Sequence, residues 1–181
     1  MAIVKNIEID GKEIPFRASA AIPRIYRVKF GRDIYKDLAF LQKIVSQNSE
    51  EASSLDSISL EMFENVAYTM AKHADPTIPN TAEEWLDDFD VFSIYLILPK
   101  IIELWNLNIQ TQAESKKKIR PSEREITTPL FLLRCVQLGI NLSELDLLTV
   151  GIVYDMLTES GNDQYKNESK ATQEDFDKIF G

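Results

Sequence analysis

The sequence predicts a mainly helical α+β protein: a helical bundle-like domain that opens with a small N-terminal β-hairpin, followed by a C-terminal helical appendage. Three features predict this fold: a hairpin pattern near the N-terminus, several stretches with helical spacing of apolar residues, and one polar, basic segment that interrupts them. The expected parts are an N-terminal domain over residues 1–113, a basic linker over 114–127 and an appendage with an acidic tail over 128–181.

The hairpin is predicted from alternating apolar and charged residues around a turn dipeptide. Ile7 is followed by an alternating stretch and then by Asp10-Gly11, which leads into a second apolar stretch at Ile14. An Asp-Gly pair favours a two-residue primed turn, which would place Ile7 opposite Ile14. Because Pro15 has no backbone N–H, the second strand should be an edge strand or very short.

The helices are predicted from capping residues, helix breakers and apolar spacing. Ser, Thr and Pro recur where helices should begin, and Gly or Pro where they should end. The first expected helices run from a Ser19 cap to Gly31, from Arg32 to about Gln47, and from a Ser59 cap to Pro76. The next begins at Thr81 and runs through Phe89 toward Leu98; Pro99 should break or kink it, and the helical pattern continues to Ile109. The last two expected helices are Leu130–Leu138 and Glu144–Glu159.

Charge and composition exclude several functional classes. The 181 residues include 20 Lys and Arg against 29 Asp and Glu, a net charge of −9 that disfavours nucleic-acid binding. The longest uncharged apolar run, Val91–Pro99, is far too short to cross a membrane, and the N-terminus has no signal-peptide pattern. Because the single Cys135 cannot form an internal disulfide, we expect a cytoplasmic protein.

Residues that carry enzyme chemistry are scarce, and we expect no catalytic residue, no metal site and no cofactor. The only histidine, His73, falls near the end of an expected helix, where the helix dipole favours partial positive charge. Cys135 has apolar neighbours in the sequence and should be a buried apolar residue. The carboxylates around Asp88-Phe89-Asp90 lack the glycine and terminal glutamate of a calcium loop, and are typical of the first turns of a capped helix.

Three features are candidate partner-binding surfaces. A basic, aromatic stretch around Arg24–Arg32 could dock acidic protein segments, in preference to nucleic acid. The expected helix Glu144–Glu159 is apolar on all sides and must be buried, on the N-terminal domain, on another copy or on a client, and the residues do not decide which. The candidate binding residues, including three in the polar tail, are Arg24, Arg27, Phe30, Arg32, Tyr154, Phe176, Ile179 and Phe180.

Two stretches carry a family resemblance. The first is Ile7–Leu38, with its hairpin, its aromatic-basic helix and the Phe-Gly-Arg-Asp turn at Phe30–Asp33. The second is Leu145–Glu159, LDLLTVGIVYDMLTE, followed by a polar tail that ends in ATQEDFDKIFG. In their order and spacing these stretches resemble the tail assembly chaperones of long, non-contractile-tailed phages that infect Gram-positive bacteria.

The resemblance implies a function that composition does not show. Such chaperones coat the long, helical tape measure protein, keep it soluble, recruit tail tube subunits, and leave before the virion is finished. The resemblance therefore implies a non-enzymatic protein of the host cytoplasm that is absent from the mature virion. In many of these phages a longer form arises by ribosomal frameshifting, and the Lys116–Lys118 run lies where lysine codons could slip.

Self-association is also expected, because the basic stretch and the apolar helix both need complementary surface. An alternative function is an acidic mimic of nucleic acid that inhibits a DNA-binding protein, although the carboxylates are interspersed with Lys and Arg. A hydrolase without a recognisable motif is a remote third possibility.

Overall fold

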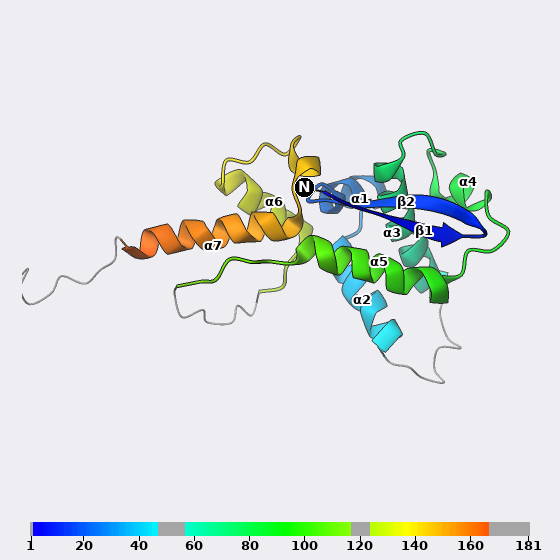
Figure 1. Ribbon diagram of the computed structural model, residues 1–181, viewed down its shortest axis with the longest axis horizontal. Coiled ribbons are helices and arrows are strands. Elements are labelled where there is room, and N and C mark those ends of the chain that lie inside the picture. The colour runs from blue at the N-terminus through cyan, green and yellow to red at the C-terminus, as the bar shows by residue number, and fades with distance from the viewer. Residues whose placement is uncertain (1, 47–56, 117–123, 167–181) are drawn as a thin grey trace, which may run out of the picture.

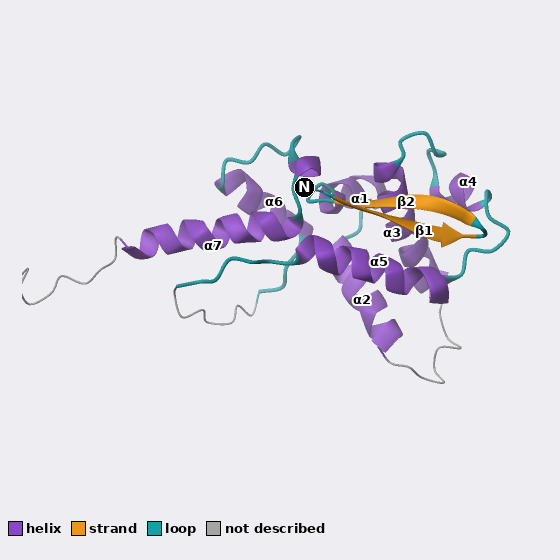
Figure 2. Ribbon diagram, in the orientation of Figure 1, coloured by secondary structure: helices purple, strands orange, loops and turns teal. Residues whose placement is uncertain are grey.

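The computed structural model describes residues 2–46, 57–116 and 124–166 and confirms the mainly helical α+β fold (Figures 1 and 2). A two-stranded antiparallel hairpin comes first, and helices make up most of the rest. The elements follow in the order β1 (Ile3–Ile9), β2 (Lys12–Ala18), α1 (Ile22–Phe30), α2 (Ile34–Ser46), α3 (Ser57–Ala74), α4 (Ala82–Leu86), α5 (Ile94–Ile109), α6 (Thr128–Gln137), a 3-10 turn η2 (Leu145–Leu147) and α7 (Val150–Lys166).

The hairpin has the predicted register. Ile7 pairs with Ile14, and Asp10 and Gly11 have positive φ angles of 51° and 71°, as a primed turn requires. Each strand has only one partner, so Pro15 lies on an edge strand as expected. One face of the hairpin is buried against α3, and α5 packs along β1.

An aromatic cluster forms the centre of the core. Trp85 of α4 is buried and makes edge-on contacts with Phe16 of β2 at 6.4 Å, Tyr68 of α3 at 5.8 Å and Phe92 at 5.4 Å between ring centroids. Phe92 in turn contacts Phe63 of α3 at 5.4 Å. These rings join the hairpin, α3, α4 and the segment before α5 into one apolar core.

Several predicted helix ends are confirmed. Gly31 follows α1 with a φ of 68°, and Gly139 follows α6 with a φ of 75°, the left-handed conformation that a helix-ending glycine supplies. Thr81 begins α4, because its Oγ1 accepts a hydrogen bond from Glu84 N at 3.2 Å.

The predicted continuous helix from Thr81 toward Leu98 is wrong. α4 ends at Leu86, and residues 87–93 are a turn and a non-helical stretch before α5 begins. The hairpin tip binds this segment: Lys12 Nζ donates to Asp88 O at 2.6 Å, and Asp90 N donates to Asp10 Oδ2 at 3.0 Å. Pro99 does not break the second part, since α5 runs through it.

Other helix starts also differ from the prediction. α1 begins at Ile22 with Ala21 at its N-cap, so Ser19 is not the cap. α3 begins at Ser57, so Ser59 lies inside its first turn and is not the cap. The expected Glu144–Glu159 helix is a 3-10 turn followed by α7, with Leu148 extended between them. Leu148 O accepts a hydrogen bond from Ala20 N at 2.8 Å, and this contact with the N-terminal region replaces a helical hydrogen bond.

The C-terminal helices pack on the rest of the same chain, which answers the question that the sequence left open. α6 contacts α1, α7 contacts α5, and Phe131, Leu145 and Val153 belong to the common core. In Figure 1, α7 then extends away from the end of α5. The division into parts at residues 113 and 127 stays a prediction.

The root of α7 is fixed by a buried amide and a glycine. Asn108 of α5 is fully buried, donates to Ser19 O at 3.3 Å and accepts from Val150 N at 3.3 Å. Gly151 lies so close to Gln110 that a Cβ there would be 1.8 Å from the Gln110 carbonyl oxygen. Only glycine fits this contact between α7 and the end of α5.

Beyond this root, α7 binds the backbone of the segment that follows α5. Asp155 Oδ1 accepts from the backbone N–H groups of Gln112 and Ala113, both at 2.8 Å. Asn162, which is buried, accepts from Lys116 N at 2.8 Å and donates to Glu114 O at 3.0 Å. The first residues of the predicted linker are therefore held along α7.

Candidate partner-binding site

A groove of about 580 Å³ lies between α2, the C-terminal half of α5 and residues 125–126. Its floor is formed by Leu38 and Trp105, which are almost fully buried, together with Tyr35, whose ring packs edge-on against Trp105 at 5.6 Å. Two of its apolar wall residues are open to solvent: the exposed fractions of Phe40 and Ile126 are 45% and 49%. The groove is therefore an open, largely apolar surface.

The helical spacing of α2 explains why Phe40 faces outward. Ile34, Leu38 and Leu41 lie on one face of the helix and are buried in the core. Phe40 lies off this face, so its ring is exposed to water. Burial of this ring against a partner would gain about 25 cal/mol for each square ångström of apolar surface covered. An apolar residue outside the buried stripe was the available sequence signal, and the sequence analysis missed it.

Charged residues line the rim of the groove. Lys36 Nζ lies 3.8 Å from Glu125 Oε2, and both side chains are largely exposed, so this ion pair is weak. Lys43 lies on the same rim and is exposed. The rim can therefore attract acidic residues that flank an apolar segment.

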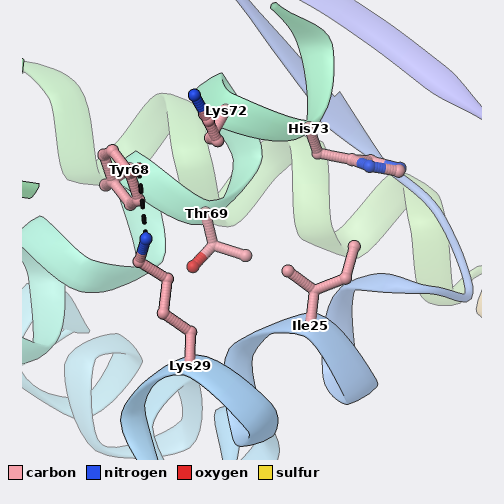
Figure 3. Close-up of a pocket in the computed structure, with 6 residues that line it drawn as sticks. All are labelled: Ile25, Lys29, Tyr68, Thr69, Lys72 and His73. Carbon is pink, nitrogen blue, oxygen red and sulfur yellow. Dashed lines mark hydrogen bonds between the residues drawn. The ribbon is translucent and has the colours of Figure 1, made fainter. Parts of the chain in front are cut away.

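A smaller cavity of about 140 Å³ between α1 and α3 is lined by two lysines and His73 (Figure 3). Lys29 Nζ donates to Asn80 O at 2.6 Å and lies 4.5 Å above the centre of the Tyr68 ring. Lys72 Nζ donates to Pro76 O at 2.9 Å and to a further backbone carbonyl of the same loop. Both ammonium groups thus hold the loop after α3, and we do not assign a ligand to this cavity.

His73 differs from the expectation of partial positive charge. Its Nε2 lies 2.9 Å from Ser19 Oγ, and burial together with the nearby Arg17 lowers its pKa from 6.5 to about 4. The ring is therefore neutral at pH 7, and it makes a structural hydrogen bond. Ser19 is fully buried, whereas His73 is partly buried and lines the cavity.

The predicted basic surface on α1 is largely occupied by contacts within the chain. Arg32 donates to both oxygens of Asp37, at 2.7 and 2.9 Å, and the Tyr26 hydroxyl donates to the same carboxylate at 2.6 Å. Arg27 lies 3.8 Å from Asp33. Of the described residues, none accepts a hydrogen bond from the buried Nε atom of Arg24. Arg32 in particular stabilises the turn between α1 and α2.

The remaining candidates are half-buried or lie outside the described residues. Phe30 packs on Tyr26 at 5.3 Å, and Tyr154 packs on Phe131 at 5.9 Å. Phe176, Ile179 and Phe180 lie beyond Lys166, outside the described residues. The structure therefore does not bring the predicted binding residues together into one surface.

Cys135 is buried, as predicted, and burial raises its pKa to about 11. In the part of the chain that the structure describes, no three His, Cys, Asp or Glu side chains form a group that could hold a metal ion. Within residues 2–46, 57–116 and 124–166, no helix has both the length and the apolar character to span a bilayer.

Comparison with known proteins gives no relative: no family model, curated protein or solved structure matches the chain. Function is therefore inferred from the groove and from the sequence resemblance to tail assembly chaperones.

Proposed function

We propose that the protein is a phage tail assembly chaperone that binds and solubilises the tape measure protein, and that the groove between α2 and α5 is its client site. The observation that supports this proposal most directly is the open apolar groove with exposed Phe40 and Ile126. A tape measure protein is long and helical, and an amphipathic helix binds by laying its apolar face into such a groove.

The composition of the groove suits a protein client. Tyr35 supplies a partly buried aromatic ring and Phe40 an exposed one, and aromatic side chains carry much of the binding energy at protein interfaces. Lys36 and Lys43 on the rim favour a client with acidic residues beside its apolar stripe. Reversible binding of this kind needs no catalytic group, in line with the proposal of a non-enzymatic protein in the host cytoplasm that leaves before the virion is complete.

Recruitment of tail tube subunits and self-association belong to the same proposal. Leu133 and Val136 are exposed on one side of α6, with exposed fractions of 48% and 57%, and offer a second apolar surface. We assign self-association to this surface, and capture of the tube protein to the C-terminal segment that contains Phe176, Ile179 and Phe180.

Co-expression with the tape measure protein of the same phage tests the client site. The variant Phe40→Asp should reduce the soluble tape measure at least tenfold, because loss of one buried aromatic anchor costs about 1.5–3 kcal/mol. Val28→Asp is the matched control: Val28 is 79% exposed on α1 and does not line the groove. Unchanged solubility with Phe40→Asp, or an equal loss with Val28→Asp, contradicts the proposed site.

The same assay distinguishes the proposed chaperone from the alternative function. An acidic mimic of nucleic acid would leave the tape measure insoluble and would instead inhibit a DNA-binding protein.

A further inference from the structure

We propose that, in the absence of a client, the groove between α2 and α5 binds the C-terminal segment of its own chain, residues 172–181. The groove is an open, largely apolar surface, and the chain itself provides a sequence complementary to it. Chemical complementarity and reach both support this occupant.

The segment has the apolar pattern that the groove needs. Phe176, Ile179 and Phe180 are spaced i, i+3 and i+4, so one helical turn would place all three side chains on the same side. The groove offers an aromatic floor at Tyr35 and Trp105 on which such a turn can pack.

The charges are also complementary. Glu174, Asp175 and Asp177 accompany the apolar residues of the segment, with Lys178 as the one basic residue among them. The described rim of the groove has the opposite net charge. It carries two lysines and one carboxylate, Glu125, which already lies beside Lys36. Contact with the rim lysines would therefore favour this segment over a neutral one.

The chain is long enough to return to the groove. α7 starts beside Gln110, which follows the groove-lining residue Ile109. From its start at Val150 to its end at Lys166, α7 is about 24 Å long at 1.5 Å per residue. The ten residues from Lys166 to Phe176 can span about 33 Å when extended. Phe176 can therefore reach the end of the groove at which α7 began.

This contact would couple the two activities of the proposed chaperone. A tape measure helix would compete with the segment for the groove and release it, so that the segment becomes available to tube subunits only after a client is bound. This coupling rests on the proposed function, whereas the contact itself does not and can be tested without any client.

Disulfide trapping in the full-length chain tests the contact. Lys43→Cys on the groove rim is combined with Lys178→Cys in the segment, and the control pair combines Lys178→Cys with Lys100→Cys, which replaces an exposed residue of α5 outside the groove lining. The native Cys135 does not compete, because it is buried and its pKa is raised to about 11. At low protein concentration the groove pair should form the intramolecular disulfide at least tenfold faster than the control pair.

Two further measurements make the test decisive. Adding Phe176→Ala and Phe180→Ala to the groove pair should slow trapping to the rate of the control pair. Equal rates for the two pairs, no effect of the alanine substitutions, or disulfides formed only between two chains would each overturn the proposal. Failure of the tape measure assay would leave this outcome unchanged, so the two proposals can fail separately.

Discussion

The centre of the molecule and the attachment of α7 are stabilised in different ways. At the centre, large side chains such as Phe16, Tyr68 and Trp85 are buried against one another, and each makes several apolar contacts. Along α7, single polar side chains such as Asp155 and Asn162 bind backbone groups of the segment that follows α5.

This difference determines how each region should respond to substitution. An apolar cluster shares its stabilisation among many contacts, so a conservative change is partly absorbed by neighbouring side chains. A polar side chain that satisfies two backbone groups has no substitute, because its loss leaves those groups unpaired. The root of α7, where Asn108 and Gly151 meet the core, should therefore be the most sensitive position of the attachment.

Gly151→Ala should have the largest effect, because its Cβ would lie 1.8 Å from the Gln110 carbonyl oxygen and 2.7 Å from the carbonyl carbon. Backbone must shift to accept it, and we expect a loss of about 3 kcal/mol in the free energy of unfolding, measured by urea denaturation. Gly161→Ala in the same helix is the control, since no atom lies within 4 Å of its Cβ position. Alanine there should be neutral or stabilise by up to about 1 kcal/mol. Equal effects at the two glycines would contradict the close contact.

Asn108→Ala should come next. It removes the acceptor of Val150 N and one of the two donors to Ser19 O, which also accepts from Ile22 N, in a fully buried position, and this should lower the free energy of unfolding by about 2–3 kcal/mol. Asn106→Ala, an exposed change on the same helix, should alter it by less than about 0.5 kcal/mol. If Asn108→Ala is as mild as Asn106→Ala, the buried amide does not fix α7.

Asp155→Ala should have a smaller and local effect. Loss of its hydrogen bonds to the N–H groups of Gln112 and Ala113 should make these two amides exchange with solvent roughly tenfold faster, while the amides of α3 keep their protection. Asp163→Ala, at an exposed position of α7, is the control and should leave the exchange of both amides unchanged. Faster exchange throughout the chain would instead mean that Asp155 supports the whole fold.

At neutral pH the smallest effect is expected from His73, which joins α3 to Ser19 near the root of α7. Because its pKa is lowered to about 4 in the folded state, the unfolded state binds the proton more readily below pH 6.5. The contribution of His73 to stability should be complete above pH 6.5 and should decrease as the pH falls toward 4. Comparison with His73→Gln isolates this contribution, and since the chain has one histidine, its NMR titration is unambiguous. A pKa near 6.5 in the folded protein would show that the ring is not held in its neutral form by burial.

The sequence was most informative where local residues decide the structure. The register of Ile7 with Ile14 follows from Asp10-Gly11, and the end of α1 follows from Gly31, because these residues favour a particular backbone conformation. The end of α4 at Leu86 was not predictable in this way. It depends on the hairpin tip, which lies far away in the sequence and binds residues 88–90.

The candidate site shows the same limit more strongly. The groove walls come from α2, α5 and residues 125–126, and only tertiary packing brings them together. For Arg32, the sequence identified a basic side chain but did not reveal its contact with Asp37. The turn at Gly31 places its guanidinium against Asp37, so a residue expected to face a partner stabilises the chain itself.

The contact between Arg17 and the carbonyl of Asp146 has a consequence for synthesis of the protein. The two residues are 129 positions apart, and a ribosome adds about 5–20 residues per second. Roughly 6–26 s therefore pass between translation of Arg17 and translation of Asp146. During this interval the Arg17 side chain lacks the Asp146 carbonyl, and the nascent hairpin is exposed to other proteins.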